Sequence, residues 1–170
     1  MQVLERSKAM AIPPLLRLAF RPFFLAGCLL ALLAIPLWLA AFSGSISDWQ
    51  PAGGWLGWHR HELLFGFGLA IIAGFLLTAV QTWTGRPGLS GRPLAALALV
   101  WLLARVAWLV NVSWALLAVL ELAFPLAVAA LMGISLWQVR QKRNYPIVVV
   151  LLLLALADGL SLYGLSAGHE

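Results

Sequence analysis

The stretch PLAALALVWLLARVAWLVNVSWALLAVLELAFPLAVAALMGISLW, residues 93–137, decides the fold of this chain. As one continuous helix rising about 1.5 Å per residue it would be about 68 Å long, more than twice the hydrocarbon thickness of a bilayer. It must therefore fold back on itself, and Asn111-Val112-Ser113 is its only polar break. The sequence predicts two membrane-crossing helices joined at this break.

The same apolar character extends over the whole chain. Of its 170 residues, 63% are hydrophobic and 10% are charged, and the mean hydropathy is +0.96. A soluble domain of this size does not combine so much apolar surface with so little polar cover. We predict an all-α, polytopic transmembrane helix bundle of about five spans, at residues 23–42, 62–83, 93–110, 114–137 and 146–165.

Lysine and arginine predict the orientation of these spans. Nine of the eleven basic residues precede or open the first span, or lie between the second and third or the fourth and fifth. The positive-inside rule then places the N-terminus inside and the C-terminus outside. Residues 1–22 are expected to form a basic amphipathic segment on the inner surface, ahead of a five-span domain over residues 23–170. The net charge of +5 is therefore a topology signal, and we expect a lipid bilayer, not nucleic acid, as the partner.

Three ionisable side chains interrupt the spans: Arg105, Glu121 and Asp158. Charged groups are costly in hydrocarbon, so each is a functional candidate. Arg105 and Glu121 lie at matched depths, roughly 8 and 10 Å below the outer ends of their spans. These depths predict an ion pair across the hairpin. The pair would neutralise both charges and need have no other role. Asp158 is expected to be protonated, hydrogen-bonded to a neighbour, or part of a hydrated site.

Glu62 heads a stripe of small residues in the second span, in which Gly66, Ala70 and Gly74 recur at every fourth position. Such stripes let membrane helices approach closely, so we expect Glu62 to face protein. The alternative is that the stripe serves packing alone and that Glu62 caps the positive end of the helix dipole.

Two histidines, His59 and His61, directly precede Glu62. On a continuous helix residues two apart diverge by roughly 200°, whereas in an extended segment they share a side and both reach one ion. Imidazole suits copper, zinc and iron. With Cys28 as the single cysteine, a thiolate cluster is excluded. The alternative is a pair of interfacial histidines that bond water and lipid headgroups.

Several motifs resemble the NnrS family. LAFRPFFL at residues 18–25 resembles the FRPFF opening of its members, and WHRHELLFGF at 58–67 resembles their WHxHEMLFGF element. AGFLLTAV at 73–80, followed by WTGRP at 83–87, resembles a third element, and the motifs stand in the family order. The chain departs from the pattern at Leu63, where methionine is usual, and it is shorter than full members.

The resemblance implies a multi-pass protein of the bacterial inner membrane that binds haem and/or copper near the periplasmic face. It implies a role in the nitric oxide response, nitrosative stress or denitrification. It further implies that His59 and His61 are metal ligands and that Glu62 belongs to the same cofactor site. Longer members contribute further helices to the site. We therefore expect that this chain forms a homo-oligomer, associates with a second membrane subunit, or is a reduced relative of the family.

Two other interpretations of the same residues stay open. The chain could be a transport or proton-relay module without a cofactor, acting through Glu62, Arg105, Glu121 and Asp158. It could also be a structural subunit of a membrane complex. The sequence contains no recognisable nucleophile–base–orienter arrangement and no phosphate loop, so enzymatic activity is neither predicted nor excluded.

Overall fold

The computed structural model of the protein describes residues 11–46 and 48–168. These residues form helices and turns without a strand. The elements are the 3-10 turn η1 (Pro14–Leu16), α2 (Phe20–Phe42), α3 (Gly54–His61), the π-helix η2 (Glu62–Gly68), α4 (Leu69–Thr84), α5 (Gly91–Leu109), α6 (Trp114–Gln138), the 3-10 turn η3 (Lys142–Asn144) and α7 (Tyr145–Ser166). Because α3, η2 and α4 run on without a break, the described chain has five helices long and apolar enough to cross a membrane.

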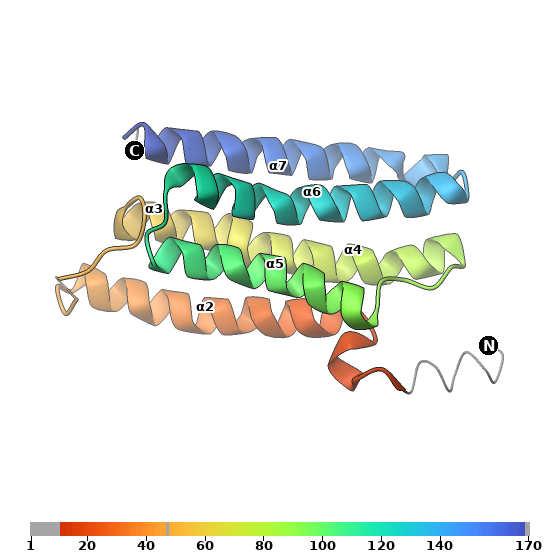
Figure 1. Cartoon of the computed structure of the whole chain (residues 1–170), viewed down its shortest axis with the longest axis horizontal. Helices are drawn as coiled ribbons and strands as arrows, with labels where there is room; N and C mark the ends of the chain where they lie inside the picture. The colour runs from red at the N-terminus through yellow and green to blue at the C-terminus, as the bar shows by residue number, and fades with distance from the viewer. Residues whose placement is uncertain (1–10, 47, 169–170) are drawn as a thin grey trace.

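The five long helices lie side by side, and consecutive ones run antiparallel (Figure 1). Helix α6 packs against α4, α5 and α7, and α2 packs against α4. Helix α2 begins at one end of the bundle, and α7 ends at the other, beside α3 (Figure 1). The predicted all-α bundle is therefore confirmed, while its direction across a membrane stays a prediction.

The predicted fold-back at Asn111 is confirmed. Helix α5 ends at Leu109 and α6 begins at Trp114. Asn111 has a φ of 53°, a left-handed conformation that asparagine tolerates better than most residues. The polar break therefore supplies the turn that a 45-residue apolar run (residues 93–137) needs.

Two of the long helices begin earlier in the chain than the predicted spans at residues 23–42 and 62–83. The first long helix begins at Phe20, and the second begins at Gly54, well before Glu62. Gly53 and Gly54 make the turn into α3 with φ values of 69° and 73°, which a glycine adopts without steric cost. The polar WHRH segment is consequently helical and forms the beginning of the second long helix.

The segment ahead of the bundle is only partly described, since residues 1–10 lie outside the described residues. In η1, Leu15 is exposed, while Leu16 packs against the hydrophobic core. Arg21 Nη1 donates a hydrogen bond to the Pro14 carbonyl at 2.7 Å. These contacts attach η1 to the bundle, and the role of residues 1–22 as a surface-lying segment stays a prediction.

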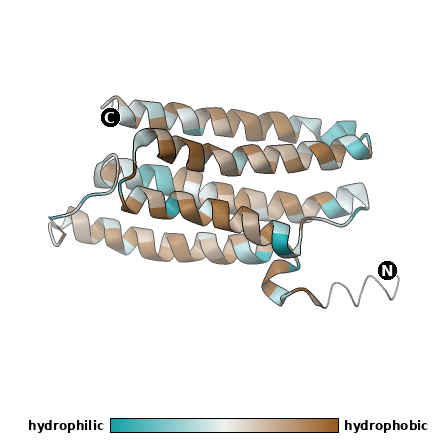
Figure 2. Ribbon diagram, viewed as in Figure 1, coloured by the Kyte–Doolittle hydropathy of each residue, from teal (hydrophilic) through white to brown (hydrophobic). Residues whose placement is uncertain are grey.

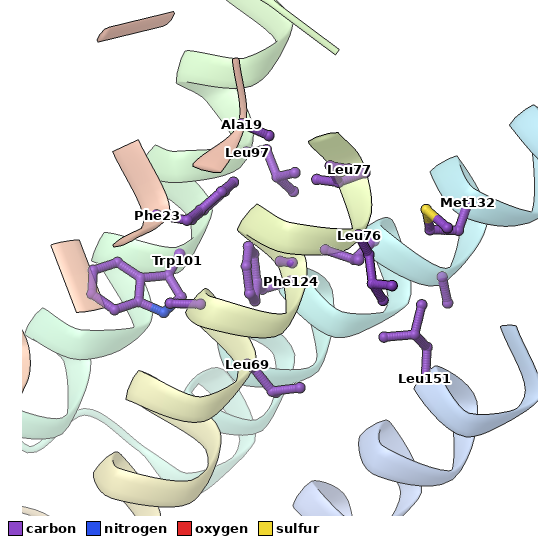
Figure 3. Packing of buried hydrophobic residues seen from close by; sticks show 14 of the residues in the cluster. Ala19, Phe23, Leu69, Leu76, Leu77, Leu97, Trp101, Phe124, Met132 and Leu151 are labelled. Carbon is purple, nitrogen blue, oxygen red and sulfur yellow. The ribbon is translucent and has the colours of Figure 1, made fainter. Parts of the chain in front are cut away.

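The larger hydrophobic core lies between α2, α4, α5, α6 and α7 (Figure 3). The rings of Phe23 and Phe124 meet there with centroids 5.3 Å apart. A Cβ added at Gly74 would lie 3.1 Å from the Phe23 side chain and 3.0 Å from Phe24. The small-residue stripe therefore allows two helices to pack closely, as predicted, and the structure shows that its partner at Gly74 is α2.

Outside this core the helices present apolar side chains over most of their length, as a lipid-facing surface requires (Figure 2). Hydrophilic segments gather around η3 and the start of α5 at one end, and within the bundle near α3 at the other (Figure 2). Part of the second group, including His61 and Glu62, is buried, and this part defines the candidate site.

Candidate functional site

Five ionisable side chains from four of the long helices meet inside the bundle. They form what we call the buried polar cluster: His61, Glu62, Arg105, Glu121 and Asp158. None is more than 6% exposed, and Asp158 is fully buried. Charged groups in such surroundings must pair with one another or hold a cation.

The imidazole of His61 lies between two carboxylates. Its Nε2 is 2.8 Å from Oδ1 of Asp158, and its Nδ1 is 3.8 Å from Oε1 of Glu62. The rings of Phe65 and Trp108 flank it, with centroids 5.1 and 4.6 Å away. Of the expectations for Asp158, the structure shows a hydrogen bond to a neighbour, and that neighbour is His61.

Arg105 connects Glu62 with the third acid of the cluster, Glu121. Its Nη2 donates to Glu121 Oε2, so the predicted ion pair across the α5–α6 hairpin is formed. Its Nε lies 3.2 Å from Glu62 Oε2. The indole N–H of Trp108 donates to the second oxygen of Glu121, and Arg105 lies 5.5 Å from the ring centroid of Trp101. The guanidinium therefore bridges the second and fourth spans.

The π-helix η2 adapts the backbone to this cluster. Trp101 Nε1 donates to the carbonyl of Gly66 at 2.9 Å, a contact inside the bundle. A Cβ on Gly66 would lie 2.8 Å from both Arg105 Nη1 and Glu62 Oε2. π-helical turns inside α-helices occur frequently at functional sites. Gly66 is thus the position where the chain makes room for the guanidinium.

Several buried polar atoms of the cluster have no hydrogen-bond partner. They are His61 Nδ1, both oxygens of Glu62, Arg105 Nε and Asp158 Oδ2. The three carboxylates of the cluster outnumber its cations, even when the imidazole is counted as a cation beside the guanidinium. The cluster therefore lacks positive charge, which a bound cation or protons must supply.

Three members of the cluster have metal-binding geometry. His61, Glu121 and Asp158 each offer one ligand atom, and these atoms lie within 4.8 Å of one another. A nitrogen with two carboxylate oxygens is a ligand set suited to divalent iron, copper or zinc. Sequence reasoning had named Glu121 and Asp158 as intramembrane polar residues. It did not place them beside His61, and depth was the one available signal, since Glu121 lies roughly 10 Å and Asp158 roughly 12 Å below the outer ends of their spans.

His59 occupies a different side of α3. Its ring stacks on Trp38 of α2, with centroids 4.3 Å apart and planes at 14°. It is partly exposed, and its Nδ1 is buried without a partner. Of the two geometries weighed for the histidine pair, the chain adopts the helical one, so His59 and His61 diverge. The third histidine, His169, lies outside the described residues.

A family model described as "NnrS protein" matches residues 14–170 of the chain. The matched region contains all five long helices and the whole buried polar cluster. Neither a curated protein nor a solved structure matches the chain.

Proposed function

This chain belongs to the NnrS family, as its motifs predicted, and we propose that it binds copper and/or haem and acts in the nitric oxide response. We propose that the protein acts under nitrosative stress or in denitrification, and that it lies in the bacterial inner membrane. The five apolar helices support a multi-pass membrane protein. The cofactor and the role in nitric oxide response come from the family resemblance.

The buried polar cluster is the observation that carries the metal assignment. A divalent cation held by His61, Glu121 and Asp158 would balance the excess of carboxylates. The cation would also provide a partner for buried atoms that have no hydrogen bond, such as Asp158 Oδ2. Glu62 Oε1 lies 3.8 Å from the other ring nitrogen of His61, so its negative charge is close to the side of the imidazole that faces away from the ion. The residues present therefore fit a metal ion.

The same position does not fit haem. His61 is 1% exposed and enclosed by Phe65 and Trp108, so no porphyrin plane can reach its ring without displacing them. His59, which is partly exposed beside Trp38, is the histidine we propose for haem. When bound, either group supplies one-electron redox chemistry.

The other residues of the cluster would prepare the site. Arg105 holds Glu121 in place from one side and lies beside Glu62 on the other. Phe65 and Trp108 exclude water from the imidazole. Three protein ligand atoms leave coordination positions for further ligands. We therefore propose a homo-oligomer or a second membrane subunit as the source of further ligands.

Metal analysis and an optical spectrum of the detergent-purified protein test this function. We expect bound copper, or haem absorbance, in the wild type. His61→Ala and Asp158→Asn should remove the metal ion, whereas His59→Ala should remove only a haem signal. The matched control is Ser166→Ala, at an exposed position of α7.

Three results would contradict the proposal. Metal content that is unchanged in His61→Ala would exclude His61 as a ligand. Wild-type protein free of metal and haem, together with ion or proton flux in liposomes, would instead support the transport alternative. Co-purification of a partner with neither cofactor nor flux would favour a structural subunit.

A further inference from the structure

The turn between α6 and α7 concentrates exposed positive charge. Arg140, Lys142 and Arg143 lie in this turn, and their side chains are exposed and make no hydrogen bond or ion pair with the described residues. Arg86, from the connection between α4 and α5, lies alongside, because its Nη1 donates a hydrogen bond to Gln138 at the end of α6. Figure 2 shows this hydrophilic surface at one end of the bundle.

No acid of the described chain offsets this charge. Asp48 lies in the connection between α2 and α3, at the other end of the bundle (Figure 1). The remaining described acids, Glu62, Glu121 and Asp158, belong to the buried polar cluster. The cations of the α6–α7 turn are therefore available to an anion from outside the described chain.

The backbone at Arg140 has a conformation that favours glycine. Its φ is 54°. The Arg140 N–H donates a hydrogen bond to the Trp137 carbonyl at 3.0 Å, and the Gln141 N–H donates to the Leu136 carbonyl at 2.9 Å. This pair of bonds is a Schellman motif, whose left-handed residue is usually glycine. An arginine here costs stability that a glycine would not, and backbone strain of this kind gathers at functional sites.

Aromatic rings indicate that this turn lies at a membrane surface. Trp137, in the last turn of α6, is 73% exposed. Its ring stacks on Tyr145, the first residue of α7, with centroids 6.2 Å apart and planes at 16°. Tryptophan and tyrosine are enriched where the hydrocarbon meets the lipid headgroups. Arg140, three residues beyond Trp137, is therefore expected at the depth of the lipid phosphates, which guanidinium groups bind well.

We propose that the α6–α7 turn binds the phosphate of an anionic phospholipid. The Arg140 guanidinium donates to the phosphate oxygens, and Lys142 and Arg143 add to the positive potential around them. A zwitterionic phospholipid has the same phosphate, but its own ammonium group offsets the negative charge, so the turn selects a headgroup of net negative charge. This inference does not depend on the proposed function, because none of these residues belongs to the buried polar cluster.

Retention of radiolabelled lipid by the detergent-purified full chain, held on an affinity resin, tests the proposal. Phosphatidylglycerol and phosphatidylcholine with identical acyl chains compare the headgroups alone, since any binding of the chains to apolar surface is equal for both. We expect saturable retention of phosphatidylglycerol in preference to phosphatidylcholine. The preference should decrease as sodium chloride is added, because salt screens exposed charges.

Arg140→Gly separates lipid binding from folding. Glycine suits the left-handed backbone, so the melting temperature should equal or exceed that of the wild type. The affinity for phosphatidylglycerol should nevertheless fall roughly fivefold, through the loss of one cation at the membrane surface. Lys142→Gln combined with Arg143→Gln leaves the backbone at Arg140 unchanged and should also weaken binding.

The matched control is Arg60→Gln, which removes one exposed cation at the α3 end of the bundle. It should bind phosphatidylglycerol like the wild type. Metal and haem content in Arg140→Gly should stay at the wild-type level, which separates failure of this proposal from failure of the proposed function.

Three results would overturn the proposal: equal retention of the two lipids, full affinity in Arg140→Gly, and an equal loss in Arg60→Gln. Competition with inorganic phosphate at matched ionic strength distinguishes the source of the phosphate. If it displaces the lipid as effectively as unlabelled phosphatidylglycerol does, the turn binds a free phosphate and the lipid assignment is wrong. Equally effective displacement by polyglutamate would instead indicate an acidic protein partner.

Discussion

Asp158 Oδ1 lies 2.8 Å from His61 Nε2, although the two residues are 97 positions apart in the chain. Both side chains are buried, so this contact joins α7 to the start of the second span inside the bundle. In the apolar interior neither group has water as an alternative partner. The contact therefore links the stability of the bundle to the candidate metal site.

We expect Asp158→Leu to destabilise the protein by about 1–3 kcal/mol, because His61 then loses its buried partner. Asp158→Asn keeps a side chain that can accept a hydrogen bond, so it should be less destabilising. Unfolding in mixed detergent, followed by circular dichroism, measures both. Equal stability of Asp158→Leu and the wild type would show that the contact is not formed.

The same aspartate should determine the effect of added metal. Binding to the folded state alone raises stability by about 2.7 kcal/mol at a free ligand concentration one hundred times Kd. We expect Cu²⁺ to raise the melting temperature of metal-depleted wild-type protein and to leave Asp158→Asn unchanged. A rise of the same size in both proteins would place the ion elsewhere.

Gly66→Ala should destabilise the bundle by about 1–3 kcal/mol through overpacking. Its Cβ would lie 2.8 Å from Arg105 Nη1 and 2.9 Å from a Leu30 methyl carbon. Gly133→Ala in α6 is the matched control, because its Cβ would meet only Val148, at 3.8 Å. We expect this control to be neutral or slightly stabilising, since alanine is the better helix former. Equal melting temperatures for the two variants would contradict the packing seen at Gly66.

Arg105→Met should cost about 3–5 kcal/mol, because it leaves two buried carboxylates without their cation. Adding Glu121→Gln removes one of these charges and should recover part of the loss. The coupling free energy from the double-mutant cycle measures the ion pair directly. Arg92→Met, at an exposed position in the first turn of α5, should change stability by less than about 0.5 kcal/mol. A coupling near zero would mean that Arg105 and Glu121 do not interact.

The predicted orientation can be tested with single cysteines in a Cys28→Ala background. Ser45→Cys lies after α2, and Lys142→Cys lies between α6 and α7 at the other end of the bundle (Figure 1). If the N-terminus is inside, a membrane-impermeant maleimide should label Ser45→Cys in intact cells and Lys142→Cys only after lysis. The reverse labelling would invert the topology and place the α3 end in the cytoplasm.

Much of the fold follows from local properties of the chain. The five apolar segments and the turn at Asn111 were predictable because span length and a polar break are set by consecutive residues. The inward orientation of Glu62 was predictable from the small residues that follow it every fourth position. The beginning of the second long helix was not predictable, because the turn at Gly53 and Gly54 allows the polar segment after it to be helical.

The amino-acid sequence thus predicted the five long apolar helices of the described residues, the polar residues within them and the small-residue face of the second helix. It left open that His61 meets Asp158 while His59 stacks on Trp38. Those features depend on how each helix is rotated and which neighbours it has. In a bilayer, the hydrophobic effect drives helices into lipid without selecting their neighbours, so that choice is made by close packing and by polar contacts between distant residues.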